Sequence, residues 1–144
     1  MTGVDRALIA ELIPHQGAMS LLEGIASWNE TSIVAISATH RAKDHPLRSN
    51  GCLRAVHLCE YGAQAAALHG GLVARAAGSV AEPGYLVSLR DVTLSCQRID
   101  ELEQTLQIRA QLLLQDSASW QYWFEASHAG TTLATGRLAI IRRR

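Results

Sequence analysis

The stretch "LRAVHLCEYGAQAAALHGGLVARAA", residues 53–77, decides the fold. It contains no proline, it is rich in Ala, Leu and Gly, and its apolar residues do not alternate with polar ones. These features predict a helix, which would be the longest in the chain. Small residues within it would let a sheet or a second backbone approach closely, and these are Ala63, Ala66, Ala67 and Gly70.

The residues before this helix predict three further segments. A short helix is expected over residues 4–12, because its spacing is helical and Pro14 disfavours helix at the preceding residue. Residues 21–39 hold two apolar stretches separated by the turn signal "WNETS", which indicates a hairpin. Residues 40–52 are polar and rich in turn formers, so they are expected to form a loop.

The residues after the helix predict antiparallel strands joined by short turns. The strands are expected over residues 85–96, 102–114, 120–126 and 133–141. In the first of them the apolar residues change from odd-numbered to even-numbered positions. This change of parity predicts a bulge near Arg90 or Asp91. Because one helix cannot cover both faces of a sheet, the strands should curl around it. The prediction is a single α+β domain over residues 1–144, a curved antiparallel sheet wrapped around one long central helix.

Such a sheet leaves an edge and an open end, which a symmetric partner would cover. A homodimer, or a heterodimer with a homologous subunit, is therefore the expected state.

The composition excludes several classes of function. The chain has 13 basic and 13 acidic residues, so no strong global charge favours nucleic acid. Its three cysteines lack CxxC spacing, which argues against a disulfide framework or a zinc site and fits a reducing compartment. No apolar run approaches the length of a membrane span, and the N-terminus lacks the features of a signal peptide. We therefore expect a cytoplasmic protein. Phosphate-binding glycine motifs and metal-ligand patterns such as HExxH are absent, so no metal is expected.

Polar residues on and before the long helix form the candidate site. His57, Glu60 and Gln64 are spaced i, i+3, i+7 and share one helix face. The helix is apolar nearly all round there, so Glu60 is expected to be buried with a raised pKa, which suits a general acid. In the preceding loop, Pro46 restricts His45 to extended conformations. With the free N–H groups of the helix start, these groups can abstract a proton next to a carbonyl, stabilise the enolate oxygen and protonate a leaving group.

Two segments of the chain resemble a known family. "LIPHQGAMSLLEGI" and "HPL…VHLCEYGAQAAA" resemble the hot-dog-fold 3-hydroxyacyl-[acyl-carrier protein] dehydratases, most closely the branch found in aryl-polyene-type biosynthetic clusters. The resemblance implies the hot-dog fold and the dehydration of 3-hydroxyacyl thioesters, carried on acyl-carrier protein, to trans-2-enoyl thioesters. This chemistry would serve fatty-acid or aryl-polyene-type biosynthesis and would need no cofactor.

The resemblance also implies a role for each matching residue. His45 corresponds to the base that removes the α-proton, and Glu60 of the other subunit to the acid that protonates the departing hydroxyl. Gln64 corresponds to the glutamine that orients this acid. The amides of Ala55 and Val56 correspond to the donors that polarise the thioester carbonyl.

The other polar residues have less specific interpretations. His57 is expected to line the mouth of the site or to meet the dimer partner, and His15 to make a structural hydrogen bond. Because carrier proteins are acidic, basic side chains are candidates for docking them, although a solvated face is the plainer interpretation. These candidates are Lys43, Arg48, Arg54, Arg142, Arg143 and Arg144.

Two alternatives to an active dehydratase remain open. The same fold hosts thioesterases that activate water with a carboxylate on the central helix, although the His45–Pro46 pair favours the dehydratase. The chain could also be a catalytically weak structural subunit of a dehydratase heterodimer. Two features support this second alternative. Ala55 stands where the dehydratases often have glycine, and His45 and Glu60 are 15 residues apart. This separation is about one residue longer than the pattern that the resemblance implies.

Overall fold

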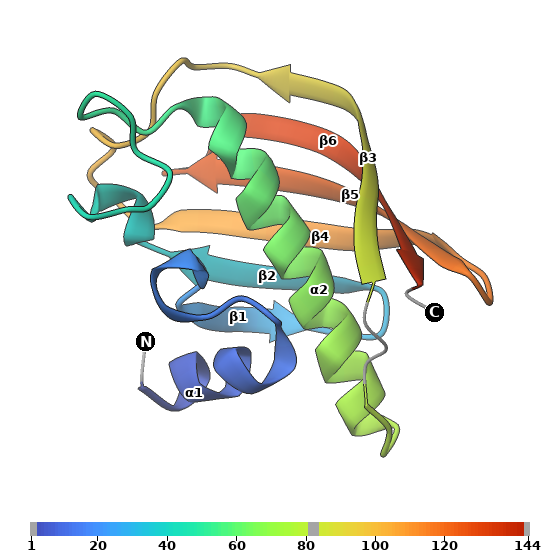
Figure 1. The fold of residues 1–144 in the computed structure, drawn as a ribbon. Helices are drawn as coiled ribbons and strands as arrows, with labels where there is room; N and C mark the ends of the chain where they lie inside the picture. The colour runs from blue at the N-terminus through green and yellow to red at the C-terminus, as the bar shows by residue number, and fades with distance from the viewer. Residues whose placement is uncertain (1–2, 81–83, 143–144) are drawn as a thin grey trace.

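The computed structural model describes residues 3–80 and 84–142 (Figure 1). The helices are α1 (Gly3–Leu12) and α2 (Leu58–Ala76), with short 3₁₀ helices η1 (Gly17–Met19), η2 (Thr39–Arg41) and η3 (Ala55–His57). The strands are β1 (Gly24–Trp28), β2 (Ser32–Ser37), β3 (Gly84–Leu94), β4 (Leu106–Gln115), β5 (Ser119–His128) and β6 (Thr131–Arg142).

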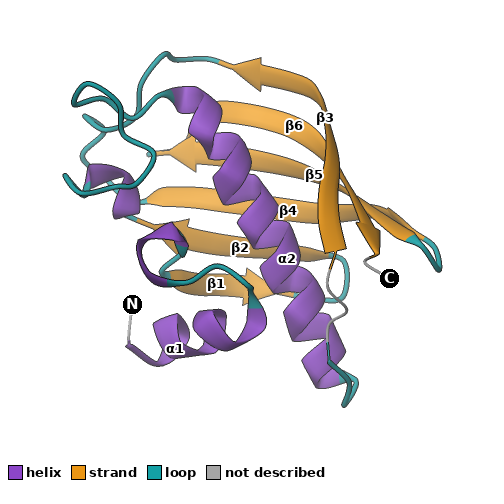
Figure 2. Ribbon diagram, in the orientation of Figure 1, coloured by secondary structure: helices purple, strands orange, loops and turns teal. Residues whose placement is uncertain are grey.

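The described residues form one six-stranded sheet in the order β1-β2-β4-β5-β6-β3, and every neighbouring pair is antiparallel. The sheet curves across α2, and α1 lies beside β1 and the lower part of α2 (Figures 1 and 2). This arrangement of one long helix inside a curved antiparallel sheet is the hot-dog fold that the sequence predicted.

The core lies between α2 and the concave face of the sheet. The buried residues of α2 recur at helical spacing, and those with large apolar side chains are Leu58, Tyr61, Leu68 and Leu72. They face alternate residues of the strands, such as Ile33, Ile108 and Phe124. Each large apolar side chain buried here stabilises the fold by about 1.5–3 kcal/mol.

A glycine sets the distance between α2 and the sheet. A Cβ atom on Gly62 would lie 2.5 Å from the ring of Phe124 in β5, so only glycine fits there without displacing the ring. By contrast, a Cβ atom on Gly70 would have no neighbour within 4 Å. The helix therefore packs closely against the sheet at Gly62, which the sequence did not single out, whereas Gly70 makes no such close contact within the described residues.

The central helix begins later than the residue 53 predicted from the sequence. The Leu53 N–H donates to Asp100 Oδ1 at 2.9 Å, and the Leu53 carbonyl accepts the Ile99 N–H at 2.9 Å. The Ala55 N–H donates to the Gln97 carbonyl at 2.9 Å. These bonds tie Leu53 and Ala55 to a distant segment of the chain, and the Leu53 carbonyl is no longer free to accept a helical N–H.

The fourth strand also begins later than predicted, at Leu106 rather than Leu102. The Leu102 N–H donates to the Ile99 carbonyl in a turn, and the Leu102 carbonyl is bonded to the imidazole of buried His40. The alternation of apolar residues extends into this turn, although the backbone there pairs with no strand.

Two local predictions from the sequence are confirmed. The β1–β2 hairpin turns at Asn29, whose side-chain oxygen accepts the N–H groups of Thr31 and Ser32. In β3 the register shifts between Arg90 and Thr93, and Asp91 has a φ of 54°, which is the bulge predicted from the change of parity. A second register shift in β3, between Leu86 and Ser88, had no signal in the sequence.

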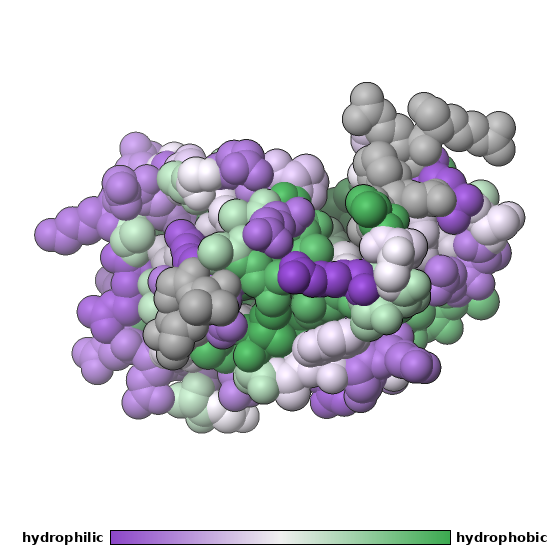
Figure 3. Space-filling model, turned by 90° about the horizontal axis from the view of Figure 1, so that it is seen from below, coloured by the Kyte–Doolittle hydropathy of each residue, from purple (hydrophilic) through white to green (hydrophobic). Residues whose placement is uncertain are grey.

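Apolar side chains remain exposed on the single chain. Strand β3 is an edge of the sheet and exposes large apolar side chains of both parities, namely Tyr85, Leu86, Val87, Leu89, Val92 and Leu94. Seen from below, apolar side chains also gather in a band across the middle of the molecule, with hydrophilic side chains around it (Figure 3). Patches of this kind mark surfaces that a partner covers. No helix within the described ranges has the length and apolar character needed to cross a membrane.

Candidate active site

Glu60 lies in the first turn of α2, and one of its two carboxylate oxygens is held by neighbouring side chains. Oε1 accepts the Nε2–H of His15 at 3.0 Å and the Nε2–H of Gln64 at 3.1 Å. Oε2 accepts no hydrogen bond from the residues that the structure describes. The Glu60 side chain is 29% exposed, so it is less buried than the sequence predicted, and Oε2 remains free to meet a ligand.

Gln64 joins this carboxylate to the N-terminal segment. Its side chain is fully buried, and its oxygen accepts the Leu21 N–H at 2.9 Å while its nitrogen donates to the Met19 carbonyl at 2.7 Å. The same nitrogen reaches Glu60. The two sequence segments that carry the family resemblance therefore lie side by side, and Gln64 is placed where a residue that orients Glu60 would be.

The hydrogen bonds change the acidity of Glu60. The hydrogen bond from His15 lowers the pKa of Glu60 more than burial raises it, and the hydrogen bond from Gln64 lowers it further. This direction is opposite to the raised pKa that the sequence predicted, because the sequence gave no sign that two N–H donors converge on Glu60. In the single chain, Glu60 is therefore a carboxylate at neutral pH.

His45 lies in the loop before the central helix and is only 5% exposed. Its Nδ1 accepts the Leu47 N–H at 3.1 Å, so the neutral ring carries its proton on Nε2. Nε2 lies 3.1 Å from the hydroxyl of Tyr61, to which it donates. The Tyr61 hydroxyl in turn donates to Thr39 Oγ1 at 2.7 Å, and Thr39 donates to the Leu21 carbonyl at 2.8 Å. Both nitrogens of His45 are therefore engaged within the chain.

Burial also sets the protonation of this cluster. It lowers the pKa of His45, and the positive charge of Arg48 lowers it further, so the ring is neutral at neutral pH. Burial raises the pKa of Tyr61 to about 12, so its hydroxyl keeps its proton. A neutral imidazole is the form that a general base requires, but here its free electron pair faces the Leu47 amide.

The start of the helix offers one free amide rather than two. The Ala55 N–H is occupied by the Gln97 carbonyl, and the His57 N–H donates to the Arg54 carbonyl at 3.1 Å. The Val56 N–H donates to no group in the described part of the chain. Of the two amides predicted to bind a thioester carbonyl, only that of Val56 is available. The residue Val56 is 50% exposed. His57 follows on η3 and is partly exposed.

Arg48 is held by contacts within the chain, and its role in docking a carrier protein stays a prediction. Its guanidinium donates to the carbonyls of Ala42 at 2.8 Å and Gly51 at 3.1 Å, and it lies 3.9 Å from the carboxylate of Asp100. Arg48 therefore braces the loop that carries His45.

The remaining docking candidates differ in their surroundings. Lys43 and Arg54 are exposed near the candidate site. Arg142 packs over the ring of Trp120, with its guanidinium carbon 5.7 Å from the ring centroid. Arg143 and Arg144 lie outside the described residues.

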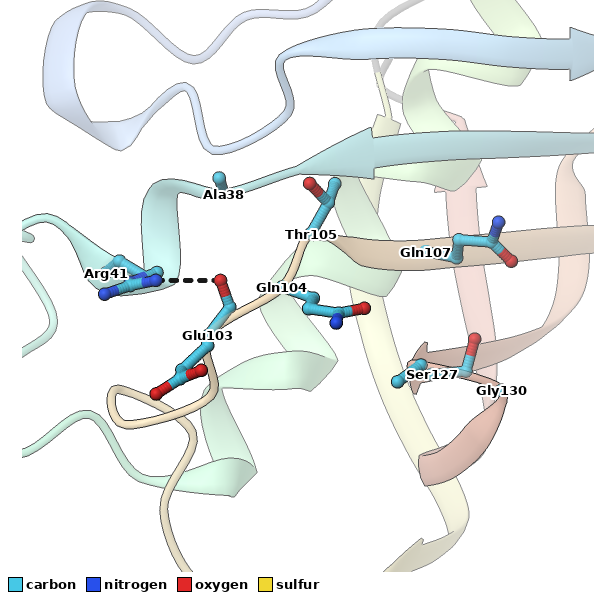
Figure 4. Close-up of a pocket in the computed structure, with 9 residues that line it drawn as sticks. Ala38, Arg41, Glu103, Gln104, Thr105, Gln107, Ser127 and Gly130 are labelled. Carbon is cyan, nitrogen blue, oxygen red and sulfur yellow. Dashed lines mark hydrogen bonds between the residues drawn. The ribbon is translucent and has the colours of Figure 1, made fainter.

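A cavity of about 720 Å³ lies elsewhere, at the ends of β2, β4 and β5 (Figure 4). Polar groups line it, and Arg41 donates across it to the Glu103 carbonyl at 2.7 Å. Its lining includes neither His45 nor Glu60, so it is separate from the candidate site. No cluster of His, Cys, Asp or Glu side chains that could hold a metal ion occurs within residues 3–80 and 84–142.

Sequence reasoning missed two partners in the site. The sequence gives Tyr61 no role of its own, and it predicts a structural hydrogen bond for His15 without naming the partner. Tyr61 contacts His45, and His15 contacts Glu60. The one available signal was the resemblance itself, since His15 and Tyr61 lie within the two matching segments.

The fold and the site together define a hot-dog protein with a hydrogen-bonded carboxylate at the start of its central helix. The ApeP-like family, described as ApeP dehydratase, matches residues 7–144. The chain therefore belongs to the ApeP-like dehydratase family, which confirms the resemblance found in the sequence. A search of curated proteins gave no match to the chain.

Solved structures agree with this assignment. A chain of the dehydratase heterocomplex ApeI:P from Xenorhabdus doucetiae is 25% identical, with a TM-score of 0.83 over 94% of this chain and 91% of that chain. A hypothetical thioesterase with coenzyme A from Streptococcus pneumoniae is 10% identical, with a TM-score of 0.64 over 99% and 97% of the two chains. A thioesterase from Haemophilus influenzae is 13% identical, with a TM-score of 0.65 over 96% and 86%. The two thioesterases show likeness of fold alone.

Proposed function

We propose that this chain is a subunit of a dimeric dehydratase that converts 3-hydroxyacyl thioesters on an acyl-carrier protein to trans-2-enoyl thioesters, in fatty-acid or aryl-polyene-type biosynthesis. The observation that carries the proposal is the carboxylate of Glu60 in the first turn of α2. Its Oε1 is fixed by two donors and its Oε2 is unoccupied, in a chain that belongs to a dehydratase family.

The proposed reaction uses groups from two subunits. The imidazole of His45 in one subunit removes the α-proton of the substrate, whose acidity comes from the thioester. The Val56 amide stabilises the negative charge that develops on the thioester oxygen. Glu60 of the other subunit, a carboxylate in the single chain, must first take up a proton from solvent. The bond between the β-carbon and the hydroxyl then breaks, the double bond forms, and Glu60 supplies this proton so that the hydroxyl leaves as water, while His45 returns the α-proton to solvent.

The exposed strand β3 supports a dimer. An edge strand with apolar side chains on both faces is a surface that another chain covers. The partner we propose is a second hot-dog subunit, either a copy of this chain or a homologue. The related structure described as a dehydratase heterocomplex favours the homologue.

A second candidate function is that of a supporting subunit in which His45 is structural. The observation that favours it is the engagement of both His45 nitrogens, by Leu47 and by Tyr61. For His45 to act as the base, the hydrogen bond from the Leu47 amide must first break, because Nδ1 holds the free electron pair of the ring and Nε2 holds its proton. In this second case the chain would contribute Glu60 to a site whose histidine belongs to the partner subunit.

Two substitutions distinguish these functions when the chain is purified with whatever partner it binds. The assay follows 3-hydroxyacyl-carrier protein by mass spectrometry, so that loss of water on an intact thioester is separated from release of a free acid. If both groups are catalytic in a homodimer, His45→Ala and Glu60→Gln each lower turnover by roughly 10²-fold or more. In a heterodimer each substitution removes one of the two sites, and the double variant shows this full loss. Glu103→Gln changes an exposed glutamate outside the site and serves as the matched control.

The outcomes distinguish three functions: an active dehydratase, a supporting subunit and a thioesterase. If Glu60→Gln abolishes turnover while His45→Ala leaves it intact, the chain is a supporting subunit. If neither substitution changes turnover, the dehydratase site proposed here is wrong. If the product is a free acid, the protein is a thioesterase. Size measurement of the purified assembly, with identification of its chains, decides between homodimer and heterodimer.

A further inference from the structure

We propose that His15 is a positioning residue of the dehydratase site, which together with Gln64 holds Oε1 of Glu60 so that Oε2 is the oxygen that exchanges a proton with the substrate. This inference rests on the proposed function, in which Glu60 is the acid. It adds a residue to the site and assigns the reacting oxygen of the carboxyl group.

The two donors converge on the same oxygen. His15 Nε2 lies 3.0 Å from Oε1, and Gln64 Nε2 lies 3.1 Å from it. Both bring a hydrogen to Oε1, so a carboxyl proton on Oε1 would face two N–H groups that already point at it. When Glu60 is protonated, the proton must therefore sit on Oε2. That oxygen has no donor among the described residues, so it can donate to a departing hydroxyl group.

His15 is suited to donate and not to accept. Its side chain is 27% exposed, but its Nδ1 atom is buried and makes no hydrogen bond within the described residues. A proton on Nδ1 would be a buried and unpaired N–H group, which is unfavourable. The single proton of the neutral ring therefore belongs on Nε2, where it meets Glu60.

The segment that carries His15 is braced on both sides. Arg6 of α1 donates to the carbonyls of Leu22 at 2.8 Å and Ser20 at 3.2 Å. Gln64 holds Met19 from the side of α2. These bonds tie the segment to both helices. The fold therefore holds the segment near Glu60, and its position does not depend on the hydrogen bond between His15 and Glu60.

The charge of Glu60 depends on a small set of groups. Among the described residues, the titratable groups that act on it are His15, from the segment after α1, and His57, from η3, and Gln64 adds an uncharged donor. The hydrogen bond from His15 is the largest of these influences, and it lowers the pKa of Glu60. Loss of this donor should therefore move the titration of Glu60 to higher pH and leave its carboxyl group free to rotate.

The experiment compares His15→Ala with His15→Gln in the protein purified with its natural partner. Glutamine keeps an N–H donor but cannot titrate, whereas alanine removes the donor. The first readout is the titration of Glu60 by NMR in protein labelled with carboxyl-¹³C glutamate, with the signal assigned by its absence in Glu60→Gln. The second readout is the dependence of kcat on pH. His128→Ala, which changes a histidine at the C-terminal end of β5, is the control.

In His15→Ala we expect the Glu60 midpoint to rise, because the largest influence that lowers its pKa is lost, and kcat to fall by roughly tenfold. In His15→Gln the midpoint should stay close to that of the unaltered protein, and most of the activity should return. An unchanged midpoint or an unchanged kcat in His15→Ala would overturn the role of His15.

The failure of the inference and that of the proposed function are distinguishable. If Glu60→Gln abolishes dehydration but His15→Ala changes neither readout, only the inference fails. If Glu60→Gln retains full activity, the proposed function fails and the inference fails with it, even where the NMR titration responds to His15.

Discussion

Gln64 is the side chain whose loss should disturb the fold and the site together. Methionine at this position would keep a side chain of similar length and volume while removing all three hydrogen bonds of the amide. The Leu21 N–H would lose its acceptor, the Met19 carbonyl its donor and Glu60 Oε1 one of its two donors. The change therefore tests hydrogen bonding with little change in packing.

The magnitude follows from which groups are left without a partner. Leu21 is fully buried, so its unpaired N–H costs about 1–3 kcal/mol. Met19 is partly exposed, so water can replace part of the bond to its carbonyl, and the cost there lies toward the lower end of the same range. The sum predicts a loss of roughly 2–5 kcal/mol in the free energy of unfolding, a large part of the about 5–15 kcal/mol typical of a domain.

Urea unfolding, monitored by circular dichroism, measures this loss. The protein concentration is held fixed, because the stability of a dimer depends on concentration. Gln64→Met should lower the urea midpoint without changing the slope of the transition. Gln107→Met, at an exposed position of β4, should change stability by less than about 0.5 kcal/mol. A loss below about 1 kcal/mol in Gln64→Met, similar to the control, would refute the claim that the amide anchors the N-terminal segment.

Two further predictions concern the core and the response to acid. Gly62→Ala would place a Cβ atom 2.5 Å from the ring of Phe124 and should cost about 1–3 kcal/mol in thermal unfolding, whereas Gly70→Ala should be neutral or stabilise by up to about 1 kcal/mol. Equal melting temperatures for the two variants would contradict this. The hydrogen bonds from Arg98 hold the pKa of Asp100 well below its ordinary value. Its contribution to stability is therefore present above the ordinary Asp pKa of about 3.9 and is lost as pH falls toward the lower folded pKa. Urea midpoints should fall less steeply between about pH 5 and pH 3 in Asp100→Asn, and an equally steep fall would contradict the assignment.

The helices and strands could largely be predicted because their signals are local. The spacing of apolar residues placed the central helix, the hairpin and the four later strands, and the change of parity placed the bulge at Asp91. The boundaries that failed depend on distant partners. Leu53 stays outside the helix because Asp100 and Ile99 take its hydrogen bonds, and Leu102 stays outside β4 because His40 and a turn take those of its backbone.

In the candidate site, too, contacts within one element could be predicted from the sequence and contacts between elements could not. The sequence determined by itself that Gln64 lies one turn from Glu60, because helical geometry fixes which side chains share a face. Only the tertiary structure decided that His15 meets Glu60, that Tyr61 meets His45, and that the Ala55 amide is already occupied. Periodicity in a sequence reports on neighbours within one element. The acidity of a carboxyl group and the free nitrogen of an imidazole depend instead on donors and acceptors from other elements, which only the folded chain brings into contact.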